Sequence, residues 1–350
     1  MLDHGKIRTL DAPSQAAAAQ WVEVDEPECW SLPTWSQLWS AQRFPHPFSS
    51  RDWFLLSRRH FATPDRLRFL VVHEELEPAA FVPLLLDEAR GTVRFAGEPE
   101  LTDYQGPVCR AGAEGATASR LLDWLDAEVT GWSELDGRDL AGAAGFVDAL
   151  AAEATRRGLL VRRELEREVP VAMPLPRTWQ EYLSSLPRKD RHELLRKRRR
   201  LALQCPKWIV RRSVGGRVRS DLATFVALHR ASIGPKGDFV DSRVEAFWHE
   251  LARLWAERGW LALHVLEIDG RAVAGTLGFE ADASVYLYNA AFDRTAGRLA
   301  PGVVLLSEVI RDAIVRGFTR FDFLRGTENY KLRLGGRPER LERLRIFTGG

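Results

Sequence analysis

The stretch WLALHVLEIDGRAVAGTLGF, residues 260–279, decides the fold because two apolar runs flank the pair Asp269-Gly270. Aspartate followed by glycine readily adopts the positive φ angles of a tight turn, so the stretch predicts a β-hairpin. A further apolar run starts at Ser284 and another at Phe318, with a helical pattern between them. Three strands, a helix and a strand predict a mixed α/β fold, in which a twisted sheet is flanked by helices.

The first half of the chain shows the same order of elements about two hundred residues earlier. Expected strands begin at Arg66, Ala79, Thr92, Leu135 and Leu159, and expected helices cover 53–61, 115–129 and 142–157. Duplication is the economical explanation of the repeated order. Two further helices are expected over 219–232 and 241–258, with Ser220 and Asp241 as their caps.

The length of 350 residues exceeds what one hydrophobic core normally holds and predicts two domains. Prolines punctuate the segment between Pro170 and Pro187, where we place the boundary. The Ala/Gln-rich start of the chain shows neither helix caps nor strand periodicity. We therefore expect a loosely ordered leader over 1–25, a first domain over 26–169 and a second domain over 170–350.

The composition is that of a globular protein with no global charge to attract a polyanion. Fifty basic residues oppose 48 acidic ones, which leaves a formal charge of +2. The three cysteines form no CxxC pair, and no apolar run is long enough to cross a membrane or to serve as a secretory signal. We expect a cytoplasmic protein. The histidines lack HxxxH spacing, so no metal site is expected.

The segment FDRTAGRLAPGVVLLSEV carries the strongest sign of a binding site, because a strand end passes through a glycine-containing turn into a helix over 301–316. Pro301 suits the first helical position. A helix N-terminus presents unpaired N–H groups and partial positive charge, so Gly297, Arg298 and Gly302 could hold a pyrophosphate. An ordinary strand-to-helix connection is the competing interpretation.

A second candidate site is FDFLRGTENYKLRLGG, which runs from a strand into a polar turn. Its functional side chains are Asp322, Arg325, Glu328, Tyr330 and Lys331. A lysine can stabilise a developing oxyanion, and a tyrosine or carboxylate can carry a proton. Alternatively, these charges solvate a sheet edge and pair among themselves.

The run RKDRHELLRKRRRL from Arg188 to Leu201 predicts a strongly basic helix. Such a run is usually a solvated helix face. Alternatively, this helix binds a phosphate-bearing substrate or a nucleic acid strand.

These motifs, taken in order, resemble those of the CelD/BcsL-type acetyltransferases, a branch of the GNAT superfamily related to the Fem (FemAB-like) peptidyltransferases. The resemblance covers about 175–347 and rests on LPRKDRHELLRKRRRL, FVALHRASIG, LEIDGRAVAGTLGF, YLYNAAFDRTAGRLAPGVVLL and FDFLRGTENYKLRLG. AFVPLLL and LTDYQGPV in the first half are similar to the N-terminal region of the same proteins. The resemblance implies tandem GNAT-like domains, with the acyl donor bound in the second.

The resemblance also implies roles for individual residues. In GNAT enzymes a Q/RxxGxG/A loop holds the CoA pyrophosphate, and Arg294 and Gly297 match its start while Leu299 replaces the last small residue. The expected donor-binding residues are Arg294, Gly297, Arg298, Pro301, Gly302 and Val303. Lysine in a motif similar to NYKLRLG assists bond formation in Fem relatives, which makes Lys331 the lead catalytic candidate, ahead of Asp103.

The sequence thus predicts an enzyme that transfers an acyl group, with acetyl expected, from acetyl-CoA to an amine or hydroxyl of a small or saccharide-like acceptor. Tyr330 or Glu328 would move the proton, with Asp322 nearby. The expected acceptor-binding residues are Lys189, Arg191, Arg325 and Tyr104. Two alternatives remain open: an aminoacyl-tRNA donor, as in Fem relatives, and an inactive GNAT-like module that only binds a partner.

Overall fold

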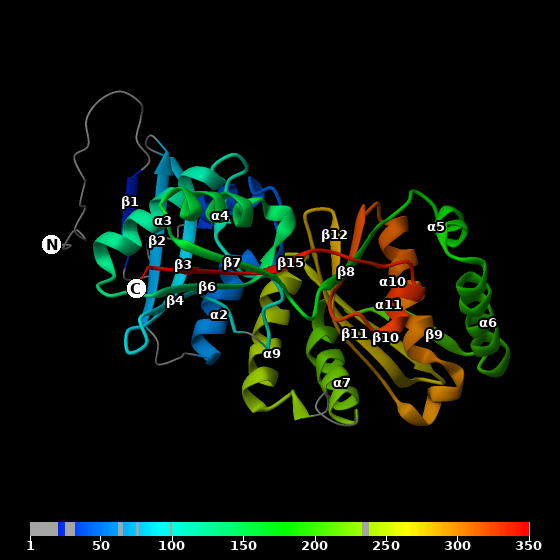
Figure 1. The fold of residues 1–350 in the computed structure, drawn as a ribbon. Coiled ribbons are helices and arrows are strands. Elements are labelled where there is room, and N and C mark those ends of the chain that lie inside the picture. The colour runs from blue at the N-terminus through cyan, green and yellow to red at the C-terminus, as the bar shows by residue number, and fades with distance from the viewer. Residues whose placement is uncertain are drawn as a thin grey trace. The chain divides into compact units, whose positions relative to one another are not determined.

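The computed structural model describes residues 20–24, 32–61, 66–74, 77–98, 100–232 and 238–349. Contacts between residues divide the chain into two compact units, one of Met1–Arg167 with Arg340–Gly350 and one of Glu168–Glu339. Each unit contains one mixed sheet with helices on both faces (Figure 1). The mixed α/β architecture that the sequence predicts is therefore confirmed.

The sheet of the first unit has the strand order β1-β2-β3-β4-β6-β15-β7, with the short β5 paired to β3. Its strands are β1 Gln20–Val24, β2 Arg66–Glu74, β3 Glu77–Asp87, β4 Thr92–Phe95, β5 Val108–Cys109, β6 Glu134–Ala141, β7 Leu160–Leu165 and β15 Leu341–Phe347. Its helices are α1 Leu32–Ser40, α2 Arg51–Phe61, α3 Glu114–Glu128 and α4 Phe146–Arg156. Only the β4–β6 pair among these strands is parallel.

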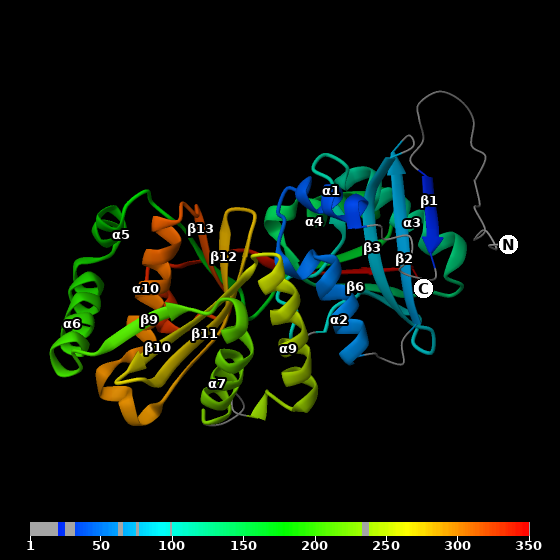
Figure 2. The ribbon, with the colours of Figure 1, turned by 180° about the vertical axis from the view of Figure 1, so that it is seen from behind.

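Both faces of β3 are buried, which explains its almost continuous apolar sequence. Val82 and Leu84 belong to the core formed with α3 and α4, whereas Phe81 stacks on Trp35 of α1 with 4.9 Å between ring centroids. Alternate residues of a strand point to opposite faces, so β3 supplies both layers. Figure 1 shows α3 and α4 in front of this sheet, and Figure 2 shows α1 and α2 from behind.

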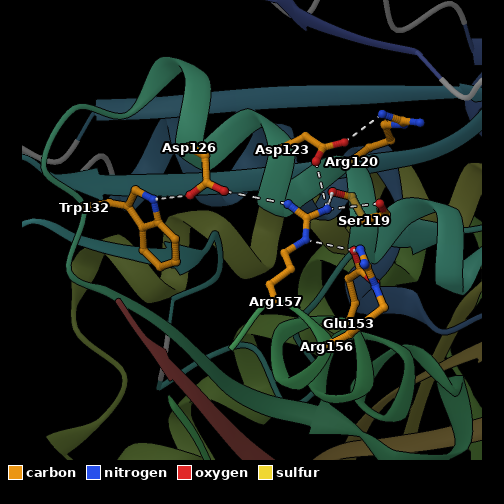
Figure 3. Close-up of polar contacts among 8 residues, drawn as sticks. All are labelled: Ser119, Arg120, Asp123, Asp126, Trp132, Glu153, Arg156 and Arg157. Carbon is orange, nitrogen blue, oxygen red and sulfur yellow. Dashed lines mark hydrogen bonds and ion pairs between the residues drawn. The ribbon is translucent and has the colours of Figure 1, made fainter. Parts of the chain in front are cut away.

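Arg157, directly after α4, joins this helix to α3 (Figure 3). Its guanidinium bonds Asp123 at 2.8 Å, Glu153 at 2.8 Å and the backbone oxygen of Ser119 at 3.0 Å. Hydrogen bonds from Arg156 and Arg157 hold the pKa of Glu153 at about 2, despite an opposing effect of burial. The network fixes the two helices against each other at one point of their contact.

The sheet of the second unit has the order β9-β10-β11-β12-β13-β8-β14. Its strands are β8 Pro170–Pro174, β9 Trp208–Arg212, β10 Leu261–Ile268, β11 Arg271–Ala281, β12 Ser284–Phe292, β13 Arg320–Arg325 and β14 Arg337–Pro338. Its helices are α5 Trp179–Ser185, α6 Arg188–Gln204, α7 Val218–Arg230, α9 Ser242–Glu257, α10 Pro301–Val315 and α11 Asn329–Arg333, with a 3₁₀ segment, η5, over Arg294–Leu299. The predicted hairpin is confirmed, since Asp269 and Gly270 both have positive φ, 50° and 78°.

Helices α7 and α10 cover opposite faces of this second sheet, as both ribbon views show (Figures 1 and 2). A Cβ added to Gly275 of β11 would lie 3.0 Å from the ring of Phe225, so α7 packs closely on that face. On the other face, His264 of β10 lies 3.9 Å from Asp312 of α10. Buried side chains of α10 from Val304 to Ile314 belong to the core on this face of the sheet. The turn that leads into this helix, residues 294–303, is the predicted anion-binding segment, called the anion turn below.

In each sheet, the strand next to the second member of the parallel pair comes from a distant part of the sequence. In the first sheet, β15 lies between β6 and β7 although it comes from the end of the chain. In the second sheet, β8 lies between β13 and β14 although it precedes every other strand of that unit. The sequence assigned 170–350 to one domain, whereas contacts group Arg340–Gly350 with the first unit.

Two local expectations are wrong. Ser220 does not cap α7, because the helix already begins at Val218 and the Ser220 hydroxyl donates to the carbonyl oxygen of Arg217. Gln20–Val24, predicted as part of a loose leader, form a strand paired with β2. The leader's remaining residues, 1–19 and 25, lie outside the described residues. The cap at Asp241 is confirmed by hydrogen bonds from the Arg243 and Val244 amides.

No described helix is long and apolar enough to cross a membrane.

Candidate active site

Strands β12 and β13 run parallel but pair over only three positions, from Ser284↔Arg320 to Tyr286↔Asp322. Beyond Tyr286, β12 continues to Phe292 with β11 as its ladder partner. The chain then enters η5 and α10, so the N-terminus of α10 follows the carboxyl end of β12. In open α/β sheets, ligands bind outside the carboxyl ends of the strands where neighbouring strands part.

The N-terminus of α10 has no cap from a side chain. Ala300, at the N-cap, is left-handed with φ 54° and ψ 47°, and no acidic residue lies in the first turn. The amide of Val304 bonds the Ala300 oxygen. The amides of Gly302 and Val303 have no partner within the described residues. Two unpaired N–H groups and the positive end of the helix dipole are features that can favour an anion.

The six residues predicted to hold a donor phosphate are brought together here. Arg294, Gly297 and Arg298 lie exposed in η5, and Pro301, Gly302 and Val303 form the first turn of α10. Asp293 begins η5 by accepting a hydrogen bond of 2.8 Å from the Thr295 amide. Hydrogen bonds from Thr295 lower the pKa of Asp293, whose charge is also paired with Arg271.

The end of β13 is a tight turn held by its own side chains. Asp322 is fully buried, and one carboxylate oxygen accepts from the Leu324 amide at 2.8 Å while the other accepts from Arg320 at 2.9 Å. Leu324 has φ 60°, a left-handed conformation that costs a non-glycine residue energy. Asp322 therefore stabilises a strained turn, which is a structural task.

Lys331 in α11 is only 3% exposed and is tied to the same turn. Its Nζ donates to the carbonyl oxygens of Leu324, Arg325 and Gly326, and it lies 2.9 Å from Glu328. An ammonium has three donors, and these acceptors use all of them. The catalytic role predicted for Lys331 remains a prediction, and its contacts favour a structural role.

Tyr330 and Glu328 lie beside this lysine but differ in exposure. Glu328 is exposed and approaches Gly326 so closely that an added Cβ there would lie 2.5 Å from its carboxylate. Burial raises the pKa of Tyr330, with a smaller contribution from the charge of Glu328. A tyrosine with a raised pKa stays protonated at neutral pH, so the Tyr330 hydroxyl can donate a hydrogen bond but holds its proton tightly.

Helix α6 packs against α10, with Arg198 paired to Glu308 and its guanidinium over the Trp179 ring. Helix α10 contacts α5, which precedes α6 in the chain, and α6 contacts η5, which precedes α10. The start of each helix therefore lies towards the end of the other, and the two run in opposite directions (Figure 1). Arg191 lies two turns before Arg198 and therefore next to the C-terminal half of α10. The predicted substrate residues Arg191 and its exposed neighbour Lys189 do not reach the anion turn.

The remaining predicted residues lie elsewhere. Arg325 is half-buried at the end of β13. Asp103 and Tyr104 belong to the first unit, where Tyr104 is 2% exposed and packs edge-on against the Phe44 ring at 5.3 Å. Such burial favours a core role for Tyr104 over contact with a substrate.

One polar pair on β12, beyond the end of its ladder with β13, was not predicted. Nε2 of His229, at the end of α7, lies 3.1 Å from Oδ1 of Asn289 on β12. Sixty residues separate the two in sequence, so no local motif indicates the pair. Among the described residues, no three His, Cys, Asp or Glu side chains cluster as metal ligands would.

Residues 188–332 match the protein family described as "Acetyltransferase (GNAT) domain". The second unit contains a GNAT acyltransferase domain. The match covers α6 to α11 and so includes both the anion turn and the turn at Lys331. No curated protein matches the sequence significantly. The acyltransferase class expected from the sequence is confirmed, whereas the CelD/BcsL type is not.

Solved structures support the fold over both units. FemX is similar with a TM-score of 0.64 and 15% identity, over 92% of this chain and 96% of FemX. A conserved protein of unknown function from Bacteroides thetaiotaomicron gives 0.62 at 12% identity, over 93% and 99% of the two chains. L-PGS from Bacillus licheniformis gives 0.51 at 12% identity, over 81% and 84%. At these identities the likeness shows the fold alone.

Proposed function

We propose that the second unit transfers an acyl group from acyl-CoA, with acetyl-CoA as the natural donor, to an amine or hydroxyl of a small or saccharide-like acceptor. On this proposal the chain is a CelD/BcsL-type enzyme that works in the cytoplasm, where acetyl-CoA is available. The observation that carries it is the bare N-terminus of α10 at the end of β12.

The donor's diphosphate would accept hydrogen bonds from the amides of Gly302 and Val303. Arg294 and Arg298 are exposed in η5 and supply positive charge on the same segment. The rest of the donor would lie along β12 beyond Tyr286, where the parallel ladder with β13 has ended. This geometry would hold the thioester beside β12 for direct attack by the acceptor.

A role at the leaving group can be assigned to a neighbouring side chain. Tyr330 keeps its proton because burial raises its pKa, so its hydroxyl would donate a hydrogen bond to the leaving CoA sulfur. No cysteine or serine with an activating base is part of this constellation, and a ternary complex is the simpler path.

Calorimetric titration of the whole chain with acetyl-CoA tests the proposal. We expect binding by the wild type and a loss of at least about tenfold in affinity for Gly302→Asp, because a carboxylate would stand where a phosphate belongs. Gly302→Ser is the matched control of similar size, since the nearest atom to an added Cβ is the Phe292 ring at 3.3 Å. Wild-type protein that gives no heat with acetyl-CoA would refute the donor assignment.

An aminoacyl-tRNA donor is the second candidate, and the exposed basic residues of α6 favour it. Arg188, Lys189, Arg196 and Arg199 are all exposed, although Arg196 is paired with Glu193. Titration with aminoacylated tRNA under the same conditions separates the two donors. Binding of charged tRNA without binding of acetyl-CoA, with a steep dependence on salt, would establish the second candidate instead.

A further inference from the structure

β12 contains a bulge that turns two consecutive side chains to the same face of the sheet. Its register with β11 shifts between Leu277↔Asn289 and Gly278↔Leu287, which leaves Tyr288 as the extra residue. Gly278 makes the bulge possible, because an added Cβ would lie 2.6 Å from the Tyr286 oxygen. Bulges often redirect a side chain next to an active site.

The contacts on each face confirm how the bulge directs these side chains. Leu287 and Ala290 pack in the core on the α10 side. Tyr288 and Asn289 point to the opposite side, where Tyr288 contacts the Trp248 ring at 6.1 Å and Asn289 meets His229. In an unbroken strand these two neighbours would lie on opposite faces. Both lie beyond Tyr286, where the ladder with β13 has ended, and both are half-buried.

His229 fixes the orientation of the Asn289 amide. The imidazole is 1% exposed and is enclosed by the rings of Phe225, Phe239 and Trp248. With Nε2 protonated, it donates to Oδ1 of Asn289 at 3.1 Å. An amide has its two N–H donors on the other atom, Nδ2. The amide nitrogen of Asn289 is therefore turned away from His229.

A transferred acyl group needs a hydrogen-bond donor for its carbonyl oxygen, and Lys331 has no donor to spare. Its three N–H bonds are directed to the turn after β13 and to Glu328. Asn289 lies instead on the strand along which the thioester would run. Side-chain amides are known donors of this kind.

We propose that Asn289 is a catalytic residue whose Nδ2 donates a hydrogen bond to the thioester carbonyl, and that His229 is the residue that positions it. This inference rests on the proposed acyl-CoA function. The acceptor's nitrogen or oxygen attacks the carbonyl carbon, and the new bond forms as the C=O π electrons move to the oxygen held by Nδ2. When the carbonyl reforms, the C–S bond breaks, and the CoA sulfur takes up one proton while the acceptor loses one.

Infrared spectroscopy of bound acetyl-CoA, labelled with ¹³C at the acetyl carbonyl, tests this inference without an acceptor. A hydrogen bond weakens the C=O bond, so we expect its stretch in the wild-type complex to lie at lower wavenumber than in free acetyl-CoA. Asn289→Ala should return the band to the free position while the affinity for acetyl-CoA changes by less than about threefold. Thr224→Ala is the matched control, because this hydroxyl bonds the Ser220 oxygen of its own helix.

Two further variants separate the residues involved. His229→Phe fills the same space but cannot donate, so part of the shift should be lost, and His229→Gln, which retains a donor, should restore it. Lys331→Met should keep the shift. A wild-type band at the free position, a shift that survives Asn289→Ala, or one that disappears only with Lys331→Met overturns the assignment to Asn289. Full retention in His229→Phe overturns the role of His229.

The two levels of the argument fail in different ways. If acetyl-CoA does not bind the wild type, the proposed function fails and this inference with it. If acetyl-CoA binds but its carbonyl is unshifted, only the role of Asn289 fails. Once an acceptor is found, Asn289→Ala should lower kcat by about 10²- to 10³-fold, as expected for one lost oxyanion donor.

Discussion

The two units differ at the N-termini of their equivalent helices. In each unit one helix connects the two parallel strands of the sheet, α3 in the first unit and α10 in the second. The N-terminus of α10 is bare, whereas that of α3 carries the carboxylate of Glu114, which accepts from the Gly112 amide at 2.8 Å and pairs with Arg43 at 3.1 Å. A carboxylate there satisfies the helix terminus and repels a phosphate.

The parallel strand pairs that these helices connect, β4–β6 and β12–β13, also differ. In both sheets the parallel pair covers three positions. In the first sheet, Gln105 then forms a parallel bridge with Leu140, and the backbone N–H of Gln105 donates to the backbone oxygen of Asp139 at 2.9 Å. The described part of the second unit has no such bridge. The first unit thus extends its parallel pair by one further bridge, which the described part of the second unit lacks.

On our proposal, one fold can therefore keep or lose a donor site through a few residues at one helix terminus. Neither unit's hydrophobic core has to change for this, because both helices remain packed on their sheets through apolar side chains. The comparison explains why the donor belongs to the second unit on our proposal. Three experiments can test it. Each concerns either the independent stability of the two units or the N-terminus of α3, where Glu114 lies.

The largest effect is expected from removing β15, by ending the chain after Glu339. Leu341, Leu344 and Ile346 are at most 1% exposed and fill the first unit's core, and each buried aliphatic side chain lost costs about 2–5 kcal/mol. The total equals or exceeds the usual stability of a domain. We expect the first unit to unfold while the second keeps its structure, as measured by hydrogen exchange of peptides from each unit.

Removing only the last two residues is the control, because β15 ends at Phe347. Protection of both units should then be unchanged. Equal loss of protection in the two units after the longer truncation would show that they do not fold separately, and the comparison between them would then have no thermodynamic basis.

The position of β15 also shows where sequence reasoning reaches its limit. Periodicity and turn residues act over a few neighbours, so the Asp269-Gly270 hairpin, β2, β3 and α10 were predicted with nearly correct ends. Strand pairing over a long distance leaves no local pattern, and so Leu341–Phe347 and Pro170–Pro174 were not assigned to their sheets.

The candidate site shows the same division. The turn from η5 into α10 was predicted because its glycines, proline and helix are contiguous in the sequence; its binding of an anion stays a prediction. The role of Lys331 depends on carbonyl oxygens five to seven residues away, and only the folded turn shows that they use its donors. His229 and Asn289 meet only because α7 packs over the bulge of β12.

An intermediate effect is expected from His46, a buried histidine of the first unit. Burial lowers its pKa from 6.5 to about 3, so the folded state holds it neutral while the unfolded state takes up a proton below about pH 6.5. Stability is therefore lost as the pH falls from 6.5 towards 3, by about 2 kcal/mol at pH 5. His46→Phe, among the rings of Phe44, Phe48 and Tyr104, should remove this loss.

Urea unfolding at pH 7 and pH 5, followed by hydrogen exchange of each unit, measures this effect. In the wild type the first unit should lose more stability than in His46→Phe between the two pH values, and the second unit should respond alike in both proteins. An equal pH dependence of the first unit in both proteins would mean that His46 is not held neutral by burial.

The smallest effect is expected from Glu114→Gln, which removes the charge that closes α3. Burial raises the pKa of Glu114, but hydrogen bonds from its own amide, Arg43 and Gly112 outweigh this and lower it overall, so the carboxylate is charged at neutral pH. Loss of that charge should destabilise the first unit by about 1 kcal/mol. Acetyl-CoA should still bind at one site only in calorimetry, because Gln105 continues to bridge Leu140 beside the helix. A second acetyl-CoA site in Glu114→Gln would show that the charge of Glu114 alone keeps the first unit from binding the donor.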